Sequence, residues 1–280
     1  MSFVNTALKV FDHLMPFSTL TMLMGKLANA QMGSFTQFLI KDFIKAYKIN
    51  MEECAVTDLS SYKTFNEFFI RRLREDVRPI SDKCYAVSPV DGSVGACGNV
   101  SAGRLIQAKG IDYSLKALLG GDVKDCAPFE NGVFSTLYLS PANYHRVHMP
   151  VDATLVKTIH IPGRHFPVGR RNTSHLEDLY TSNERLVCIF ENRYGPFCLI
   201  FVGAAIVGSI HTEWAGTLTR RKGIEIKYFE PDQYTFAKGD EIGYFCFGST
   251  VICMWPENTA ELTENIVQNS PIKLGEPLGR

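Results

Sequence analysis

Three residue types that can act together in nucleophilic catalysis occur in three short motifs of this sequence. Asp91 stands in residues 88–92 (SPVDG), a turn-forming stretch that follows an expected strand. His148 lies in a second motif, and Ser249 follows a glycine in a third. An aspartate, a histidine and a serine can supply an orienting group, a base and a nucleophile. Chain order does not identify such a set, and each residue taken alone is more often part of a turn or a polar core.

The second motif, residues 144–150 (YHRVHMP), holds two of the seven histidines. His145 and His148 would share one face of a helix but point to opposite faces of a strand. Pro150 favours extended backbone at the end of the motif. A zinc site would need further ligands, and no cysteine or carboxylate stands nearby at ligand spacing. We therefore predict no metal at these histidines.

The third motif, residues 247–250 (FGST), interrupts an apolar run that extends from 244 to 255. Such a stretch is normally only a turn. Here Gly248 has no side chain, so its backbone can adopt strained conformations and its carbonyl is sterically open. A hydroxyl beside an open carbonyl, as on Ser249, is the arrangement that an intramolecular N→O acyl shift requires.

Composition and missing motifs exclude several classes of function. Lys and Arg total 29 and Asp and Glu total 29, and this net charge of zero argues against a nucleic-acid-binding protein. The sequence contains no G-x-S-x-G, phosphate-binding loop, H-E-x-x-H or dinucleotide-binding glycine motif. The eight cysteines form no C-x-x-C pair, which predicts separate thiols rather than a zinc ribbon or a disulfide framework.

Residues 1–50 differ from the rest of the chain in pattern and charge. Apolar residues recur at helical spacing in three stretches, 7–15, 20–27 and 35–47. The segment carries five lysines and two aspartates beside faces rich in Met and Phe. Such amphipathic helices suit a membrane interface, but the same pattern also fits a helical layer packed on the body of the protein.

The rest of the chain predicts mainly β structure. A capping box at 64–67 (TFNE) indicates a short helix continuing to residue 73, and another helix is expected within 113–119. We predict an α+β protein, in which an N-terminal helical segment precedes a β-rich, sandwich- or barrel-like body. Strands are expected at 132–140, 154–161, 185–191, 197–210 and 242–253.

Beyond these patterns, the sequence resembles the bacterial phosphatidylserine decarboxylases of the short type, which are made as self-cleaving proenzymes. The resemblance covers most of residues 50–278 in the family's order, and the motif 144–150 is highly specific. Phe247 stands where the family most often has leucine, a position that flanks the expected cut rather than doing chemistry. The matching stretches are 64–69 (TFNEFF), 74–80 (REDVRPI), 88–92 (SPVDG), 107–110 (QAKG), 113–115 (YSL), 144–150 (YHRVHMP), 201–210 (FVGAAIVGSI) and 247–250 (FGST).

The resemblance implies a self-processing triad of Asp91, His148 and Ser249. His148 would take the proton of the Ser249 hydroxyl while Asp91 fixes the tautomer of the imidazole. Ser249 would then attack the Gly248 carbonyl, and β-elimination would separate the chain after Gly248. Loss of ammonia would leave a pyruvoyl group in place of Ser249.

The resemblance also implies the reaction, which is decarboxylation of phosphatidylserine to phosphatidylethanolamine. Loss of carbon dioxide from an amino acid generates a carbanion, and a pyruvoyl carbonyl joined to the serine amine as a Schiff base can accept those electrons. No external cofactor is then needed, in agreement with the missing cofactor motifs. His145 is the residue expected to assist decarboxylation or to reprotonate the carbanion.

The lipid substrate favours membrane docking for residues 1–50, because an enzyme of a bilayer lipid without a spanning helix must bind the surface. Residues 51–280 would form the catalytic domain, with processing giving a β chain, 1–248, and an α chain, 249–280. The family further implies a homodimer, peripheral to the cytoplasmic face of the bacterial cell membrane. The sequence does not rank the possible phosphate contacts, which are Arg71, Arg72, Arg164, Arg170, Arg171, Arg220 and Arg221.

Three other hypotheses use the same residues. A serine hydrolase would keep an intact chain, with Ser249 as an acylating nucleophile that reacts with fluorophosphonates. A non-catalytic lipid-binding protein would use His145 and His148 only in a polar core network. A relative with the same processing would act on another serine-headed lipid.

Overall fold

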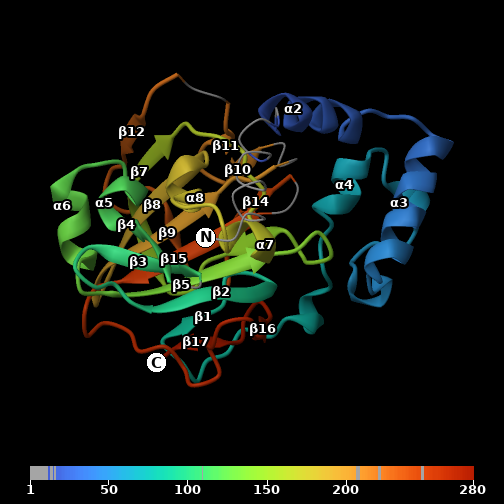
Figure 1. Cartoon of the computed structure of the whole chain (residues 1–280). Helices are drawn as coiled ribbons and strands as arrows, with labels where there is room; N and C mark the ends of the chain where they lie inside the picture. Colours follow the sequence, from blue (N-terminus) through green and yellow to red (C-terminus); the bar gives the residue numbers. More distant parts are fainter. Residues whose placement is uncertain are drawn as a thin grey trace.

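The body of the protein is built on a nine-stranded antiparallel sheet (Figure 1). The computed structural model describes residues 12, 15, 17–108, 110–205, 209–219, 222–246 and 249–280. The strands of the large sheet follow the order β12 (Glu225–Tyr228), β7 (Ala153–Ile161), β8 (Arg185–Asn192), β9 (Gly195–Val202), β15 (Ser249–Trp255), β5 (Val133–Leu139), β2 (Gly92–Asn99) and β16 (Pro271–Ile272), and β13 (Thr235–Phe236) also pairs with β7.

Three smaller sheets complete the β structure of the described residues. The α+β class is confirmed, but the barrel alternative is wrong, because β12 and β16 stand at opposite ends of an open strand order and do not pair. A four-stranded sheet has the order β11 (Gly216–Thr217), β10 (Ile210–Thr212), β14 (Glu241–Phe245) and β6 (Arg146–His148). The two-stranded sheets pair β1 (Ala86–Val87) with β17 (Pro277–Gly279), and β3 (Arg104–Ala108) with β4 (Ile111–Ser114).

The central strands of the large sheet are buried on both faces. Every residue of β15 is buried, and β9 is buried from Phe197 to its end. A strand covered on both sides needs apolar side chains at successive positions, which explains the continuous apolar runs of the sequence. The predictions of β5, β7, β8 and β9 are confirmed, although the run expected at 197–210 is divided, because β9 ends at Val202 and β10 begins at Ile210.

The predicted interruption at 247–250 separates two sheets. β14 ends at Phe245 in the four-stranded sheet, whereas β15 begins at Ser249 in the nine-stranded sheet. Gly248 itself lies outside the described residues. The structure thus places Ser249 at the first position of a central, buried strand.

Short helices connect the strands. The helix expected at 113–119 is partly confirmed, since β4 continues to Ser114 and that residue then caps α5 through a bond from the Ala117 amide at 3.3 Å. The short α-helices are α5 (Leu115–Leu118), α6 (Val123–Cys126), α7 (Arg170–Thr173) and α8 (Leu179–Ser182). The 3-10 turns are η1 (Met51–Glu53), η2 (Leu59–Ser61), η3 (Glu75–Val77) and η4 (Ala127–Phe129).

Helix α4 (Phe65–Phe69) begins at the predicted capping box. The Thr64 hydroxyl accepts a bond from the Glu67 amide at 3.1 Å, and the Glu67 carboxylate accepts one from the Lys63 amide at 2.7 Å. The helix ends at Phe69, earlier than expected, because Leu73 pairs with Cys54 in an isolated β-bridge. This short helix brings two fully buried phenylalanines, Phe68 and Phe69, to the inner side of the helical region.

Helices α2 (Phe17–Ala28) and α3 (Ser34–Tyr47) confirm two of the three expected N-terminal helices (Figure 1). The third, at 7–15, falls mostly outside the described residues. α3 packs on α4 through Phe43, whose ring contacts Phe65, Phe68 and Phe69. Among the helices that the structure describes, none is long and apolar enough to cross a bilayer.

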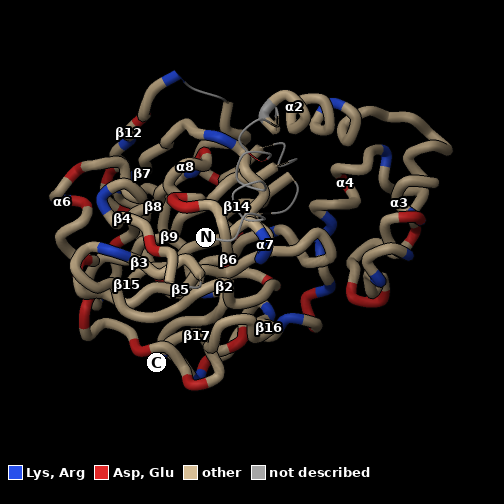
Figure 2. Tube along the Cα trace, viewed as in Figure 1, with Lys and Arg blue, Asp and Glu red and all other residues tan. Residues whose placement is uncertain are grey.

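Helices α2 and α3 carry several exposed apolar side chains. Leu23 is 55% exposed and Phe38 is 61% exposed. Lys26 is the one charged residue of α2, whereas the charges of α3 gather toward its C-terminal end (Figure 2). These exposed apolar side chains do not decide between the two predicted roles of the segment, which are docking at a membrane interface and packing on the body of the protein.

Candidate active site

Ser249 is fully buried at the start of β15. It lies opposite Leu139 of β5, and the next residue, Thr250, lies between Tyr138 of β5 and Val202 of β9. Its hydroxyl has no hydrogen-bond partner among the residues that the structure describes. A buried hydroxyl without a partner costs free energy and so needs an explanation, and a role as nucleophile would supply one for Ser249.

Asp91 lies at the same end of the sheet, on the other side of β5. It directly precedes β2, in which Ser93 pairs with Tyr138. Gly92 permits this pairing, because a Cβ there would lie 2.4 Å from the Tyr138 carbonyl oxygen. Since β15 and β2 flank β5, two strand spacings separate Ser249 from Asp91, roughly 10 Å across the sheet.

The Asp91 carboxylate is held by a buried arginine and a backbone amide. Arg78 donates from Nε at 2.8 Å and from Nη2 at 2.6 Å, and the Leu274 amide donates at 2.9 Å. Arg78 also pairs with Glu53 at 2.7 Å. The hydrogen bonds that Arg78 donates to Asp91 and Glu53 outweigh the effect of burial and raise the pKa of Arg78. The guanidinium therefore stays charged and holds the Asp91 carboxylate in place.

His148 lies on β6 in extended backbone, which resolves the choice between helix and strand for this motif. Its Nδ1 lies 2.8 Å from the Gly239 carbonyl oxygen, and its Nε2 lies 3.2 Å from the Tyr144 hydroxyl. A carbonyl can only accept, so Nδ1 carries the proton and Nε2 is left as the basic nitrogen. Burial lowers the pKa of His148, which favours this neutral form, the one that a general base requires.

The three residues of the predicted triad share one region but form no continuous hydrogen-bonded chain among the described contacts. The His148 amide donates to the Pro89 carbonyl at 2.9 Å, which ties β6 to the turn that carries Asp91. The Nδ1 proton of His148, however, is held by Gly239, and the Asp91 carboxylate is occupied by Arg78 and Leu274.

His145 is fully buried and lies against an aromatic ring. Its Nδ1 bonds to the Asn143 carbonyl at 2.8 Å, and its ring centroid lies 4.1 Å from that of Phe69. Nε2 has no partner in the described part of the chain. Burial, together with the nearby Arg71 guanidinium, lowers the pKa of His145 to about 3, so the ring is neutral at physiological pH.

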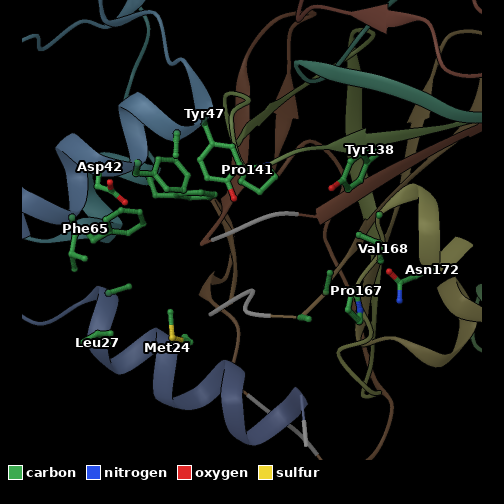
Figure 3. Close-up of a pocket in the computed structure, with 18 residues that line it drawn as sticks. Met24, Leu27, Asp42, Tyr47, Phe65, Tyr138, Pro141, Pro167, Val168 and Asn172 are labelled. Carbon is green, nitrogen blue, oxygen red and sulfur yellow. The ribbon is translucent and has the colours of Figure 1, made fainter. Parts of the chain in front are cut away.

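An apolar cavity of about 520 Å³ opens beside the strands that carry these residues (Figure 3). Figure 3 shows Met24 and Leu27 of α2 on one side, with Tyr138 and Asn172 of the body on another. Because Tyr138 lies opposite Thr250, the cavity adjoins the start of β15. The remaining lining residues include Phe43 and Phe65 from the helical region and Pro141, Pro167, Val168 and Ala204 from the body.

Within the described ranges, no group of three or more His, Cys, Asp or Glu side chains could hold a metal ion. Glu184 does lie between two buried histidines, with His160 and His165 each 2.9 Å from one of its oxygens. Burial raises the pKa of Glu184, but the bonds to these histidines outweigh burial and lower its pKa to about 2. The eight cysteines are free thiols.

Several contributors to the site were missed in the sequence. Arg78 stands in the matching stretch 74–80 but has no predicted role there, and its partner Asp91 lies 13 residues away. Gly239, which orients His148, lies 91 residues from it and carries no motif of its own. Tyr144 offered one signal, because it stands within the histidine motif four residues before His148.

Comparison with known proteins shows the family to which the chain belongs. A family model described as phosphatidylserine decarboxylase matches residues 65–280, and a second, described as PSD, matches residues 10–48. A protein of Herminiimonas arsenicoxydans is 42% identical over 271 residues, covering 96% of this chain and 92% of the relative. One of Aliivibrio fischeri is 45% identical over 272 residues, covering 95% of each chain. Both are named phosphatidylserine decarboxylase proenzyme.

The chain is therefore an enzyme of the carboxy-lyase class. It belongs to the phosphatidylserine decarboxylase family, as the sequence resemblance predicted. A third relative, from Pseudoalteromonas translucida, is 42% identical over 275 residues and covers 96% of both chains.

Proposed function

We propose that this protein decarboxylates phosphatidylserine to phosphatidylethanolamine, using a pyruvoyl group made from Ser249 by self-cleavage after Gly248. The observation that carries the proposal is the fully buried Ser249 hydroxyl, which has no partner among the described residues and stands where the chain crosses from one sheet to another. Its relatives named as proenzymes support a processing step.

The chain's own residues supply the parts of the processing reaction. His148 is neutral with Nε2 basic, so it can accept the proton when the Ser249 hydroxyl attacks the Gly248 carbonyl. Burial raises the pKa of Tyr144, which keeps its hydroxyl protonated and donating to Nε2. The Ser249 hydroxyl must therefore replace Tyr144 at this nitrogen. The attack converts the amide to an ester, and β-elimination then releases the Gly248 carboxylate.

The resulting dehydroalanine end takes up water and loses ammonia, which leaves the pyruvoyl carbonyl at the start of β15. This carbonyl supplies an electron sink for an amine substrate that has condensed with it. The site fits such a group, because the position of Ser249 is buried, adjoins the apolar cavity and excludes water. His145, neutral and with a free Nε2, is the candidate to move a proton at the substrate carbon.

The helical region fits a role at the membrane surface. Leu23 and Phe38 expose apolar side chains, and residues of α2 and α3 also line the cavity beside β15. A lipid that enters between these helices and the body would reach the sheet without leaving an apolar environment. Docking on the cytoplasmic face and a homodimer, both implied by the family, stay predictions.

The intact mass of the denatured, purified protein tests the proposal. We expect two chains, 1–248 and 249–280, the smaller of which is lighter by one ammonia than a peptide that begins with serine. A single mass of 280 residues from active protein would contradict the pyruvoyl mechanism. In that case labelling of Ser249 by a fluorophosphonate would identify a serine hydrolase instead.

A further inference from the structure

Arg71 is a buried guanidinium with open hydrogen-bond donors. The residue is 5% exposed, and its Nη2 donates to the Ala142 carbonyl at 3.2 Å. Its Nε and Nη1 are buried and have no oxygen or nitrogen partner in the part of the chain that the structure describes, although the neighbouring Cys54 thiol interacts with the guanidinium. Buried charges are normally paired, and buried donors are normally bonded. Two free N–H groups on one buried cation therefore mark a place for an anion.

The described groups around Arg71 do not neutralise it. Its guanidinium carbon lies 5.3 Å from the centre of the Phe68 ring. Burial lowers the pKa of neighbouring His145 to about 3, with Arg71 itself contributing, so that ring is uncharged. Burial likewise raises the pKa of the adjacent Cys54 thiol, which stays protonated. No ion pair joins Arg71 to any described carboxylate.

The other arginines expected as phosphate contacts are engaged or exposed. Arg72 is 66% exposed at its side chain and pairs with Glu241 at 3.1 Å. Arg164 lies over the Phe166 ring, and Arg170 and Arg171 are exposed on α7. Residues 220 and 221 lie outside the described ranges. Among the described candidates, Arg71 alone combines burial with open donors.

Arg71 and His145 lie behind the same wall of the apolar cavity. Phe69 lines the cavity and its ring packs against that of His145. Pro141 also lines the cavity, and it directly precedes Ala142, whose carbonyl accepts the bond from Arg71. A head group that enters the cavity and turns the Phe69 ring aside would meet the open donors of Arg71 together with the free Nε2 of His145.

We propose that Arg71 binds the phosphodiester of the substrate head group through one of its open donors, Nε or Nη1, with the reacting serine carbon held at His145. This inference rests on the proposed function. With Nη2 bonded to Ala142, the guanidinium keeps its charge and still offers a fixed N–H donor to the phosphate, whereas a lysine would offer a point charge on a flexible stem. In phosphatidylserine only the ester oxygen and the β-carbon separate the phosphorus from the reacting α-carbon of the serine. One site can therefore hold both groups.

The chemistry favours the phosphodiester over the serine carboxylate as the partner. The carboxylate loses its charge as carbon dioxide leaves, so a buried guanidinium on it would stabilise the ground state more than the transition state and slow the reaction. The phosphodiester keeps its charge throughout, and its binding is equal in both states. Arg71 on the phosphate therefore anchors the head group without opposing the reaction.

Capture of soluble amines on the mature enzyme by borohydride reduction tests the proposal. Four amines separate the groups: serine, ethanolamine, glycerophosphoserine and glycerophosphoethanolamine. In Arg71→Gln we expect capture of both phosphodiesters to weaken about 10- to 100-fold, the effect of losing a charged hydrogen bond, with serine and ethanolamine unchanged. Arg71→Lys should fall between, and Arg72→Gln, the exposed neighbour, should match the parent.

The alternatives give different patterns. Loss of serine and glycerophosphoserine capture, with both ethanolamine compounds unchanged, would assign Arg71 to the carboxylate and overturn the proposal. An equal loss for all four amines would assign it a structural role. In the parent enzyme, which needs no variant to fold, glycerophosphoethanolamine must be captured more strongly than ethanolamine, and equal capture would also overturn it. Failure of the pyruvoyl mechanism is distinct, because then the parent stays uncut and captures no amine.

Discussion

The central sheet and the N-terminal helices differ in how far their apolar side chains are buried. Every side chain of β15 is buried, so this strand is stabilised within the protein. In α2 and α3, by contrast, Leu23 and Phe38 are more than half exposed. The apolar side chains of the central strand are thus covered within the protein, whereas α2 and α3 carry apolar surface that the body does not cover.

The largest expected effect is the complete loss of self-cleavage in a protein whose sheet still folds. Ser249→Ala and His148→Ala should each give an uncut, inactive chain, because the first removes the nucleophile and the second the base. Intact mass and thermal unfolding measure the two properties separately.

Ser135→Ala is the matched control, since Ser135 is another fully buried serine of the large sheet, on β5. It should be cut and active. Normal cleavage in His148→Ala would remove that residue as the processing base.

A second variant separates processing from turnover within the body. His145→Ala should be cut normally but should decarboxylate at least about 100-fold more slowly, the effect of losing a general acid–base group. Because the pKa of His145 is lowered to about 3, its titration should not shape the rate above about pH 4. Turnover equal to that of the parent would show that His145 has no part in the reaction.

A third prediction tests the buried polar network of the body. The pKa of Glu184 is lowered from 4.5 to about 2, so its contribution to stability is full above about pH 4.5 and is lost as the pH falls toward 2. Glu184→Gln should therefore reduce the free energy of unfolding at pH 7 by up to roughly 3 kcal/mol. In urea titrations, the difference in free energy of unfolding between Glu184→Gln and the parent should become smaller below pH 4.5.

Glu257→Gln, at an exposed position, serves as the control and should leave stability unchanged at either pH. A gap between parent and Glu184→Gln that is constant from pH 7 to pH 3 would show that the carboxylate charge does not stabilise the fold.

The smallest effect is expected on the helices, and it should appear only in lipid binding. Phe38→Ser should weaken binding to phosphatidylserine-containing vesicles about 10-fold, the effect of burying one large apolar side chain less completely. Self-cleavage and thermal stability should not change, because the side chain is exposed in the protein. Val123→Ser, an equally exposed position on α6 of the body, should bind vesicles as the parent does. Equal binding by both variants would place the membrane contact elsewhere.

The sequence predicted local structure where one segment decides it. The Thr64 cap, helix α3 and the buried strands β8 and β9 each depend on neighbours along the chain, and each was found. The open edge of the large sheet could not be predicted in this way. It depends on the pairing of β16 with β2, two strands separated by most of the chain.

The residues of the candidate site were identified by motif, but their contacts were not. Asp91 was expected to orient His148. In the structure, the Asp91 carboxylate accepts hydrogen bonds from Arg78, and His148 Nδ1 bonds to the Gly239 carbonyl. Both contacts are made by groups without a distinctive sequence signal, an arginine among several and a backbone carbonyl. Long-range partners of this kind are set by the packing of whole strands, which no local pattern contains.

The position of β15 between β9 and β5 has a consequence for the order of events in the life of the chain. On the proposed mechanism, the reactive carbonyl is created at the end of a central strand that both neighbours already hold. Only a chain that has assembled its sheet can form this carbonyl, so the processing reaction requires that folding is already complete. A misfolded copy would remain an inert serine-containing polypeptide and would expose no carbonyl to the amines of the cell.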